Sequence, residues 1–133
     1  MGTEIIWDNE EETILRYVFG EYWTWEDFFA AKDKAYNMID AGGQKVGVII
    51  DAPANVWLPH KLIVHGRRAL QGKHENTAIV VFVTSSPFVR TMVNAVITVS
   101  RGLNVYLSIT ASVDDARVLI VKRLAAANKP VQS

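Results

Sequence analysis

The sequence predicts one α/β domain with the element order ββαβαβαβα and a five-stranded, mostly parallel sheet. Apolar runs of strand length alternate along the chain with helix-length segments, and turn or cap residues separate them. Helices between consecutive strands favour parallel pairing through right-handed crossovers. The first two strands have no helix between them, so they are expected to form an antiparallel hairpin that leaves an N-terminal edge strand. A length of 133 residues suits a single domain.

The N-terminal third is expected to hold this hairpin and the first helix. Residues 4–8 and 13–19 have the composition of short strands joined by a turn. Thr24 is a helix-capping residue followed by two acids, which favour the positive end of a helix. The helix is expected to reach about Ala41, because Gly42-Gly43 provides a left-handed stop.

The rest of the chain continues as strand–helix units. The segment KVGVIIDA is almost continuously apolar, which is typical of a central strand covered on both faces. Proline favours the first turn of a helix, and Ser86 and Ser112 are good helix caps. The expected elements are a strand at 45–52, a helix at 59–72, a strand at 76–84, a helix at 86–101, a strand at 104–110 and a helix at 112–128. One domain over 1–133 is predicted, with its core at about 5–128 and a frayed tail at 129–133.

Composition excludes several chemistries. The chain has no cysteine, so it forms no disulfide, thiolate nucleophile or cysteine zinc site. The N-terminus is acidic and lacks the apolar stretch of a signal peptide. The apolar runs are too short to span a membrane. These features favour a cytoplasmic protein.

The charges are segregated although they sum to zero. Residues 1–51 carry 11 acids and 4 bases, whereas residues 52–133 carry 3 acids and 10 bases. The two halves attract one another within one fold, or the polar molecule packs head-to-tail or presents a basic patch to an anion. Neither a net basic charge nor a recognisable motif points to nucleic acid.

A candidate functional edge lies at the carboxyl ends of the parallel strands, where ligands bind in open sheets of this kind. Ser85 and Ser86 lie beside Arg90 at a helix start, where free N–H groups favour an anion. The alternative is that Ser86 serves only as a helix cap. The candidate edge consists of Asp51, Asn55, Trp57, His60, Ser85, Ser86 and Arg90.

No complete catalytic site is found at this edge, and the chain is expected not to be an enzyme. Asp51 at a strand end suggests a phosphoacceptor, but the acid pair and the lysine that such chemistry needs are missing. His60 and His65 are five residues apart, rather than at the four-residue spacing of helical metal ligands. No metal or cofactor is expected.

The predicted third helix is apolar on nearly all sides, which is typical of a helix that is covered on more than one side. Either its neighbours bury it within the subunit, or part of it contacts a partner. The candidate partner-facing residues are Phe88, Val89, Met92, Val93, Val96 and Ile97.

The chain resembles the STAS-like, or SpoIIAA-like, domain family over roughly residues 5–128. The resemblance rests on the element order, on the helix opening Thr24-Trp25-Glu26-Asp27-Phe28, and on VGVIIDAPANVWLPHKL, which is similar to that family's strand–loop–helix. It is strongest to small stand-alone bacterial members. The resemblance implies a sheet with helices mainly on one face, leaving the other face or an edge for a partner.

The chain departs from this family at the family's phosphorylatable serine. That place reads Leu58-Pro59-His60-Lys61-Leu62, and no Ser or Thr occurs between Asp51 and Arg68. The phospho-switch therefore does not carry over. We expect a non-enzymatic regulatory or protein-interaction module, a homodimer or a binder of another protein. The alternative is a domain that binds a small anion, another small ligand or a lipid at the carboxyl edge.

Overall fold

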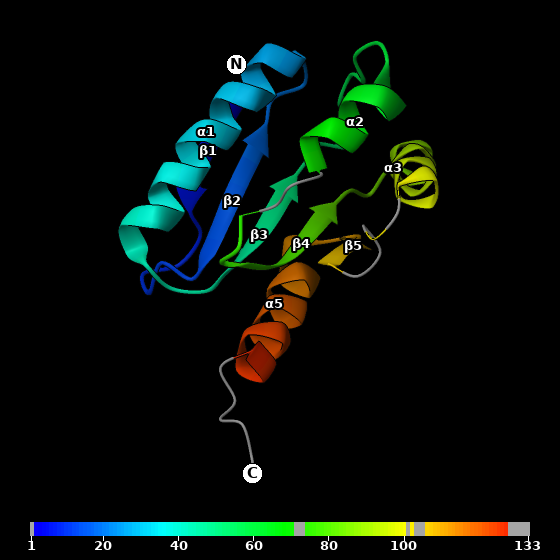
Figure 1. Cartoon of the computed structure of the whole chain (residues 1–133). Helices are drawn as coiled ribbons and strands as arrows, with labels where there is room; N and C mark the ends of the chain where they lie inside the picture. Colours follow the sequence, from blue (N-terminus) through cyan, green and yellow to red (C-terminus); the bar gives the residue numbers. More distant parts are fainter. Residues whose placement is uncertain (1, 71–73, 101, 103–105, 128–133) are drawn as a thin grey trace.

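The computed structural model describes residues 2–70, 74–100, 102 and 106–127, and it has the predicted element order (Figure 1). Within these residues the helices are all too short or too polar to cross a lipid bilayer. The elements are β1 (Thr3–Trp7), β2 (Ile14–Phe19), α1 (Trp25–Gly42), β3 (Val46–Asp51), α2 (Leu62–Leu70), β4 (Thr77–Val83), α3 (Pro87–Val99), β5 (Leu107–Thr110) and α5 (Val113–Ala127).

The five strands form one sheet in the order β1-β2-β3-β4-β5. β1 runs antiparallel to β2, with Ile5 opposite Tyr17, and the other pairs are parallel. This arrangement confirms the predicted hairpin and the mostly parallel sheet. Because β2 to β5 run parallel to one another, their carboxyl ends meet at one edge of the sheet.

Helices cover both faces of the sheet, but unequally. α1, α2 and α3 lie on one face, over a core that includes Leu15, Tyr17 and Ile50. α5 lies on the opposite face, against Ile49 and Val81. Alternate residues of a strand point to opposite faces, so the continuous apolar run in β3 is explained by helices on both sides. Three of the four described helices therefore share one face.

The ends of α1 follow the predicted capping chemistry. The hydroxyl of Thr24 accepts a hydrogen bond from Asp27 N, and the Asp27 carboxylate accepts one from Thr24 N. This reciprocal pair satisfies two N–H groups that the first helical turn leaves free. Gly43 ends the helix at φ 67°, a left-handed conformation that glycine adopts without strain.

The start of α2 was predicted three residues too early. The helix begins at Leu62 rather than Pro59, because Lys61 has a φ of 57°, which is incompatible with a right-handed helix. The indole Nε1 of Trp25 donates to the carbonyl oxygen of His60 at 3.0 Å, so tertiary contacts hold this turn outside the helix. β5 begins at Leu107, and predicted residues 71–72, 101, 104–105 and 128–133 lie outside the described residues.

Candidate functional site

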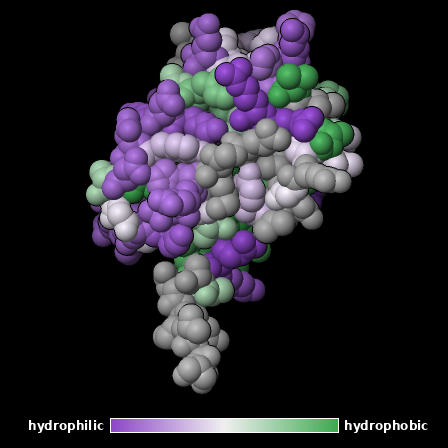
Figure 2. All heavy atoms as spheres, in the orientation of Figure 1, coloured by the Kyte–Doolittle hydropathy of each residue, from purple (hydrophilic) through white to green (hydrophobic). Residues whose placement is uncertain are grey.

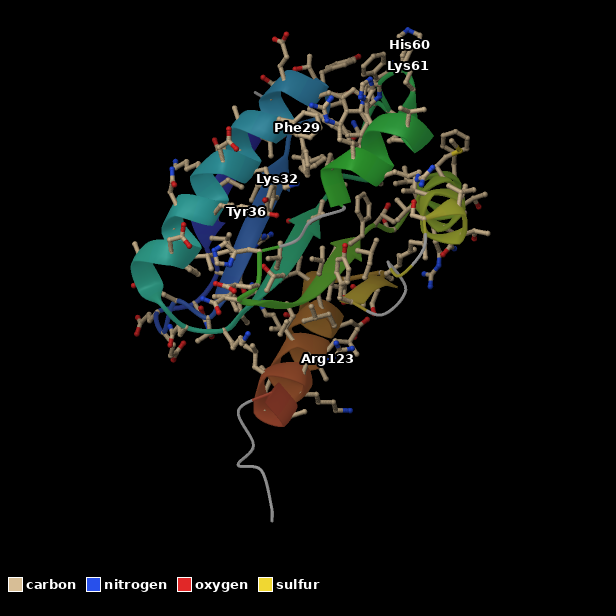
Figure 3. All side chains as sticks on the ribbon, viewed as in Figure 1. Phe29, Lys32, Tyr36, His60, Lys61 and Arg123 are labelled. Atoms are coloured by element: carbon tan, nitrogen blue, oxygen red, sulfur yellow. The ribbon has the colours of Figure 1, made fainter. Side chains whose placement is uncertain are left out.

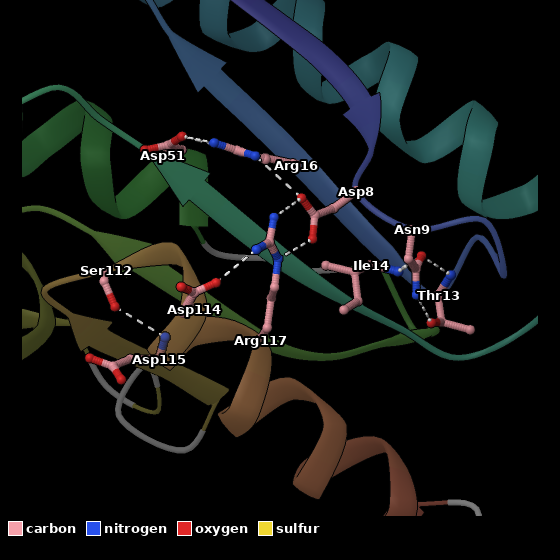
Figure 4. Close-up of polar contacts among 10 residues, drawn as sticks. All are labelled: Asp8, Asn9, Thr13, Ile14, Arg16, Asp51, Ser112, Asp114, Asp115 and Arg117. Atoms are coloured by element: carbon pink, nitrogen blue, oxygen red, sulfur yellow. Dashed lines mark hydrogen bonds and ion pairs between the residues drawn. The ribbon is translucent and has the colours of Figure 1, made fainter.

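Asp51, one of the predicted residues of the carboxyl edge, is engaged in an ion pair. Its carboxylate accepts hydrogen bonds from Arg16 Nε at 3.1 Å and from Arg16 Nη2 (Figure 4). Strand alternation places both side chains on the face of the sheet that carries α5. Ser86, which starts α3, belongs to the opposite face, so the structure does not bring Asp51 together with Ser85, Ser86 and Arg90 as predicted.

Arg16 belongs to a polar network that ties α5 to the N-terminal hairpin. Asp8 accepts hydrogen bonds from Arg117 Nε at 2.8 Å and Nη2 at 2.9 Å, and from Arg16 Nη1 at 3.3 Å (Figure 4). The side chain of Asp8 is only 4% exposed. The hydrogen bonds from Arg117 are the main cause that holds the pKa of Asp8 below its ordinary value of 3.8, against the opposing effect of burial. The network therefore has a structural role, because it holds α5 against the N-terminal hairpin.

Acid is expected to weaken the Asp8 network by protonating its carboxylate. Because folding lowers the pKa of Asp8, its contribution to stability is complete above about pH 4 and is lost as pH falls through the folded-state value. Asp8→Asn is expected to reduce the free energy of unfolding by about 1 to 2 kcal/mol at neutral pH. Urea unfolding of both proteins at about pH 7 and about pH 3 tests this, since the difference should shrink in acid. An equal difference at both pH values would contradict the electrostatic explanation. Asp114→Asn removes an exposed contact to the same Arg117 and is the control.

The loop after β3 presents aromatic side chains at the carboxyl edge. Trp57 is 46% exposed, and its ring centroid lies 6.4 Å from those of both Tyr22 and His60. The backbone N–H of Trp57 donates to Glu21 O at 2.7 Å, which fixes the loop to the β2–α1 connection. Asn55 is exposed in the same loop. The structure thus brings Trp57 and His60 together as predicted and adds Tyr22, which is 66% exposed.

Ser86 is a helix cap. Its hydroxyl accepts a hydrogen bond from Val89 N at 3.2 Å, and its own N–H donates to Thr84 Oγ1 at 3.1 Å. Ser85 and Arg90 are exposed. The structure therefore shows that Ser86 caps α3.

The apolar surface of α3 divides into two stripes. Val89, Val93 and Val96 are 2%, 8% and 3% exposed and pack into the core of the subunit, so the prediction that they face a partner was wrong. Ile97 is partly buried against the same core. The other stripe points outward at helical spacing of four, three and four residues. It consists of Phe88 and Val99, which are exposed, and of Met92 and Ala95, which are half-buried.

The outward stripe is among the most apolar exposed features of the molecule. Phe88 is 65% exposed and Val99 is 49% exposed. Figure 2 shows hydrophilic residues over most of α1 and hydrophobic residues at the surface over α2 and α3. On the opposite sheet face, α5 packs on β3, β4 and β5, and the hairpin half carries the Asp8–Arg16 network. The outward stripe of α3 is therefore a better apolar docking surface than the sheet.

Two small cavities lie between the sheet and the helices above it. One of about 40 Å³ is lined by residues of α1, β2, β3 and β4, and one of about 60 Å³ by residues of all three helices on that face. Pockets for drug-sized ligands measure about 300 to 1,000 Å³. Neither cavity has room for a lipid.

The described residues form an α/β fold with an outward apolar helix stripe and an aromatic edge. The part of the chain that the structure describes contains no cluster of acids and histidines that would hold a metal ion. Comparisons with models of protein families, with curated proteins and with solved structures find no match.

Sequence reasoning missed Tyr22, the Asp8 network and one lysine of α1. The network joins residues 109 positions apart, and no local pattern indicates such a pair. Lys32 had a detectable signal. It stands in a helical series with Trp25, Phe29 and Tyr36, where an apolar residue is expected.

Proposed function

We propose that this chain is a non-enzymatic protein-interaction module of the STAS-like type that forms a homodimer through α3. The observation that carries the proposal is the outward stripe of Phe88, Met92, Ala95 and Val99. Contiguous exposed apolar surface of this kind is typical of interaction sites. The phosphorylatable serine of the STAS-like family has no counterpart at Leu58–Leu62 of this chain, so the proposed module acts by association alone.

A second copy of the chain is the partner that this stripe suits. Arg90 is the only charged residue between Pro87 and Val99. In a symmetric antiparallel pair the two stripes face each other, and the two Arg90 side chains are about 10 Å apart along the helix axes. That distance is about one Debye length at moderate salt, so their repulsion is weak.

Phe88→Asp is expected to weaken the dimer about 30-fold, because it replaces the largest apolar side chain of the stripe with a carboxylate. Sedimentation of the protein over a wide concentration range gives the dissociation constant. Val121→Asp is the matched control, since Val121 is 60% exposed on α5, on the other face of the sheet. This control should dimerise like the unmodified chain.

Three results would contradict the proposal. The first is a monomer at high micromolar concentration, and the second is a dimer that Phe88→Asp leaves intact. The third is a dimer that dissociates with added salt, which would indicate head-to-tail attraction between the acidic and basic halves instead. An apolar contact changes little with salt.

The alternative class is a domain that binds a small ligand or a lipid at the carboxyl edge. The exposed Tyr22–Trp57 pair supports it, as does a surface groove beside that pair. The small volumes of the interior cavities favour the interaction module over an enclosed lipid site. Trp fluorescence of the freshly purified protein, titrated with lipid vesicles, distinguishes the two.

A further inference from the structure

The seam between α1 and α2 contains two cations, Lys32 and Arg68, that form no ion pair among the described residues. Lys32 Nζ lies 5.5 Å from the ring centroid of Tyr36, and Arg68 Cζ lies 5.5 Å from that of Phe29. Figure 3 shows Phe29, Lys32 and Tyr36 along the side of α1 that faces α2. None of the ion pairs among the described residues includes Lys32 or Arg68.

Lys32 is held in an environment that disfavours its charge. Partial burial is the main cause that lowers its pKa, and Arg68 lowers the pKa further. Asp33, the next residue of α1, has the opposite effect but forms no ion pair with it. An anion beside Lys32 would relieve this unfavourable arrangement.

The cavity of about 40 Å³ adjoins this lysine and is also lined by a tyrosine. Lys32 and Tyr17 both line the cavity. Tyr17 is 5% exposed. Its phenolic hydroxyl is a hydrogen-bond donor that a carboxylate in this cavity can use. The volume is enough for about three water molecules, or for the carboxylate group that would replace them.

The neighbouring cavity is apolar, whereas the first is lined in part by Lys32. Its volume is about 60 Å³ and its walls are apolar side chains, among them Phe82 and Val93. Phe28, Ile50 and Ala69 line both cavities, so the two are adjacent. A cationic end and an apolar end side by side match a molecule with a charged head and a short apolar tail.

We propose that the seam between α1 and α2 binds a small organic monocarboxylate, with its carboxylate at Lys32 and Tyr17 and its tail in the apolar cavity. Lys32 and Arg68 supply the positive field, and the Tyr17 hydroxyl donates a hydrogen bond to a carboxylate oxygen. This site is separate from the outward stripe of α3 and does not depend on dimerisation.

Calorimetric titration of the full chain with hexanoate tests the proposal, because hexanoate joins one carboxylate to a short apolar chain. We expect hexanoate to bind saturably, acetate to bind more weakly, and 1-hexanol not to bind. Chloride and phosphate are titrated as well. If they bind and hexanoate does not, the site takes inorganic anions only and the proposal is overturned. Equal affinity for hexanoate and acetate would overturn the placement of the tail, and no saturable hexanoate binding at millimolar concentration would overturn the site.

Lys32→Met is expected to weaken hexanoate binding at least tenfold, because it keeps the length of the side chain but removes its charge. Lys34→Met, at an exposed position on α1, is the control and should bind like the unmodified chain. Tyr17→Phe should weaken binding severalfold. Without ligand, Lys32→Met should melt at or above the temperature of the unmodified chain. A lower melting temperature, or unchanged binding, would show that Lys32 serves the fold instead.

Discussion

Gly47→Ala is expected to destabilise the protein by about 3 kcal/mol, the upper range for an overpacked core. Gly47 lies in β3, beneath α5. A Cβ atom at Gly47 would lie 2.3 Å from Ile120 Cγ2 and 2.9 Å from Ile120 Cγ1. Ile120 is fully buried, so its side chain has no free space in which to move. α5 must then shift away from the sheet, and urea unfolding measures the loss.

A double-mutant cycle separates this clash from other effects of the added methyl group. Ile120→Ala alone should cost about 2 to 5 kcal/mol through the cavity it leaves. The double variant with Gly47→Ala and Ile120→Ala should lose less stability than the sum of the losses of the two single variants. The reason is that the new methyl group occupies part of the cavity left by Ile120→Ala. Gly42→Ala is the control. Gly42 lies at the end of α1 with no atom within 4 Å of an added Cβ, so its replacement should raise stability by up to about 1 kcal/mol. Additive losses at positions 47 and 120 would contradict the close packing.

Val93→Asp is expected to unfold the protein, at a cost of about 4 kcal/mol or more. Val93 is 8% exposed and belongs to the core cluster beneath α3. A carboxylate at this position is buried without a partner, and the apolar contacts of the valine are lost as well. Typical domains have only about 5 to 15 kcal/mol of stability in total. Circular dichroism and a thermal melt measure the loss.

The neighbouring position provides the matched comparison. Asn94 is the next residue and is exposed on the same helix. Asn94→Asp adds the same charge at the surface, so it should leave the melting temperature almost unchanged. A folded Val93→Asp protein that has become monomeric would contradict the assignment of Val93 to the core. Substitutions that test association belong at Phe88 and its stripe.

Local patterns predicted the elements that depend on neighbouring residues. The capping pair at Thr24, the left-handed stop at Gly43 and the cap at Ser86 are all set by chemistry within a few positions. The start of α2 was misjudged because the hydrogen bond from Trp25 to the carbonyl of His60 crosses 35 positions. Proline favours the first turn of a helix but does not by itself establish one.

The candidate edge was predicted from topology, and only part of it came together. Trp57 and His60 are neighbours as expected because they share one loop. Asp51 is separated from Ser86 because strand alternation directs it to the other face, toward Arg16. An apolar helix likewise does not reveal which stripe is inside. Packing against α2 and the sheet decided that Val93 is covered and Phe88 is exposed.

The sequence alone determined the class of fold, the order of elements and the absence of cysteine chemistry, since these follow from composition and from short-range periodicity. The tertiary structure decided which side chains meet. It placed α5, alone among the described helices, on one face with Gly47 beneath it, joined Asp8 to Arg117, and left Lys32 and Arg68 without an ion pair among the described residues. The physical reason is distance along the chain. Contacts between residues far apart in sequence depend on the packing of whole elements, which no local pattern records.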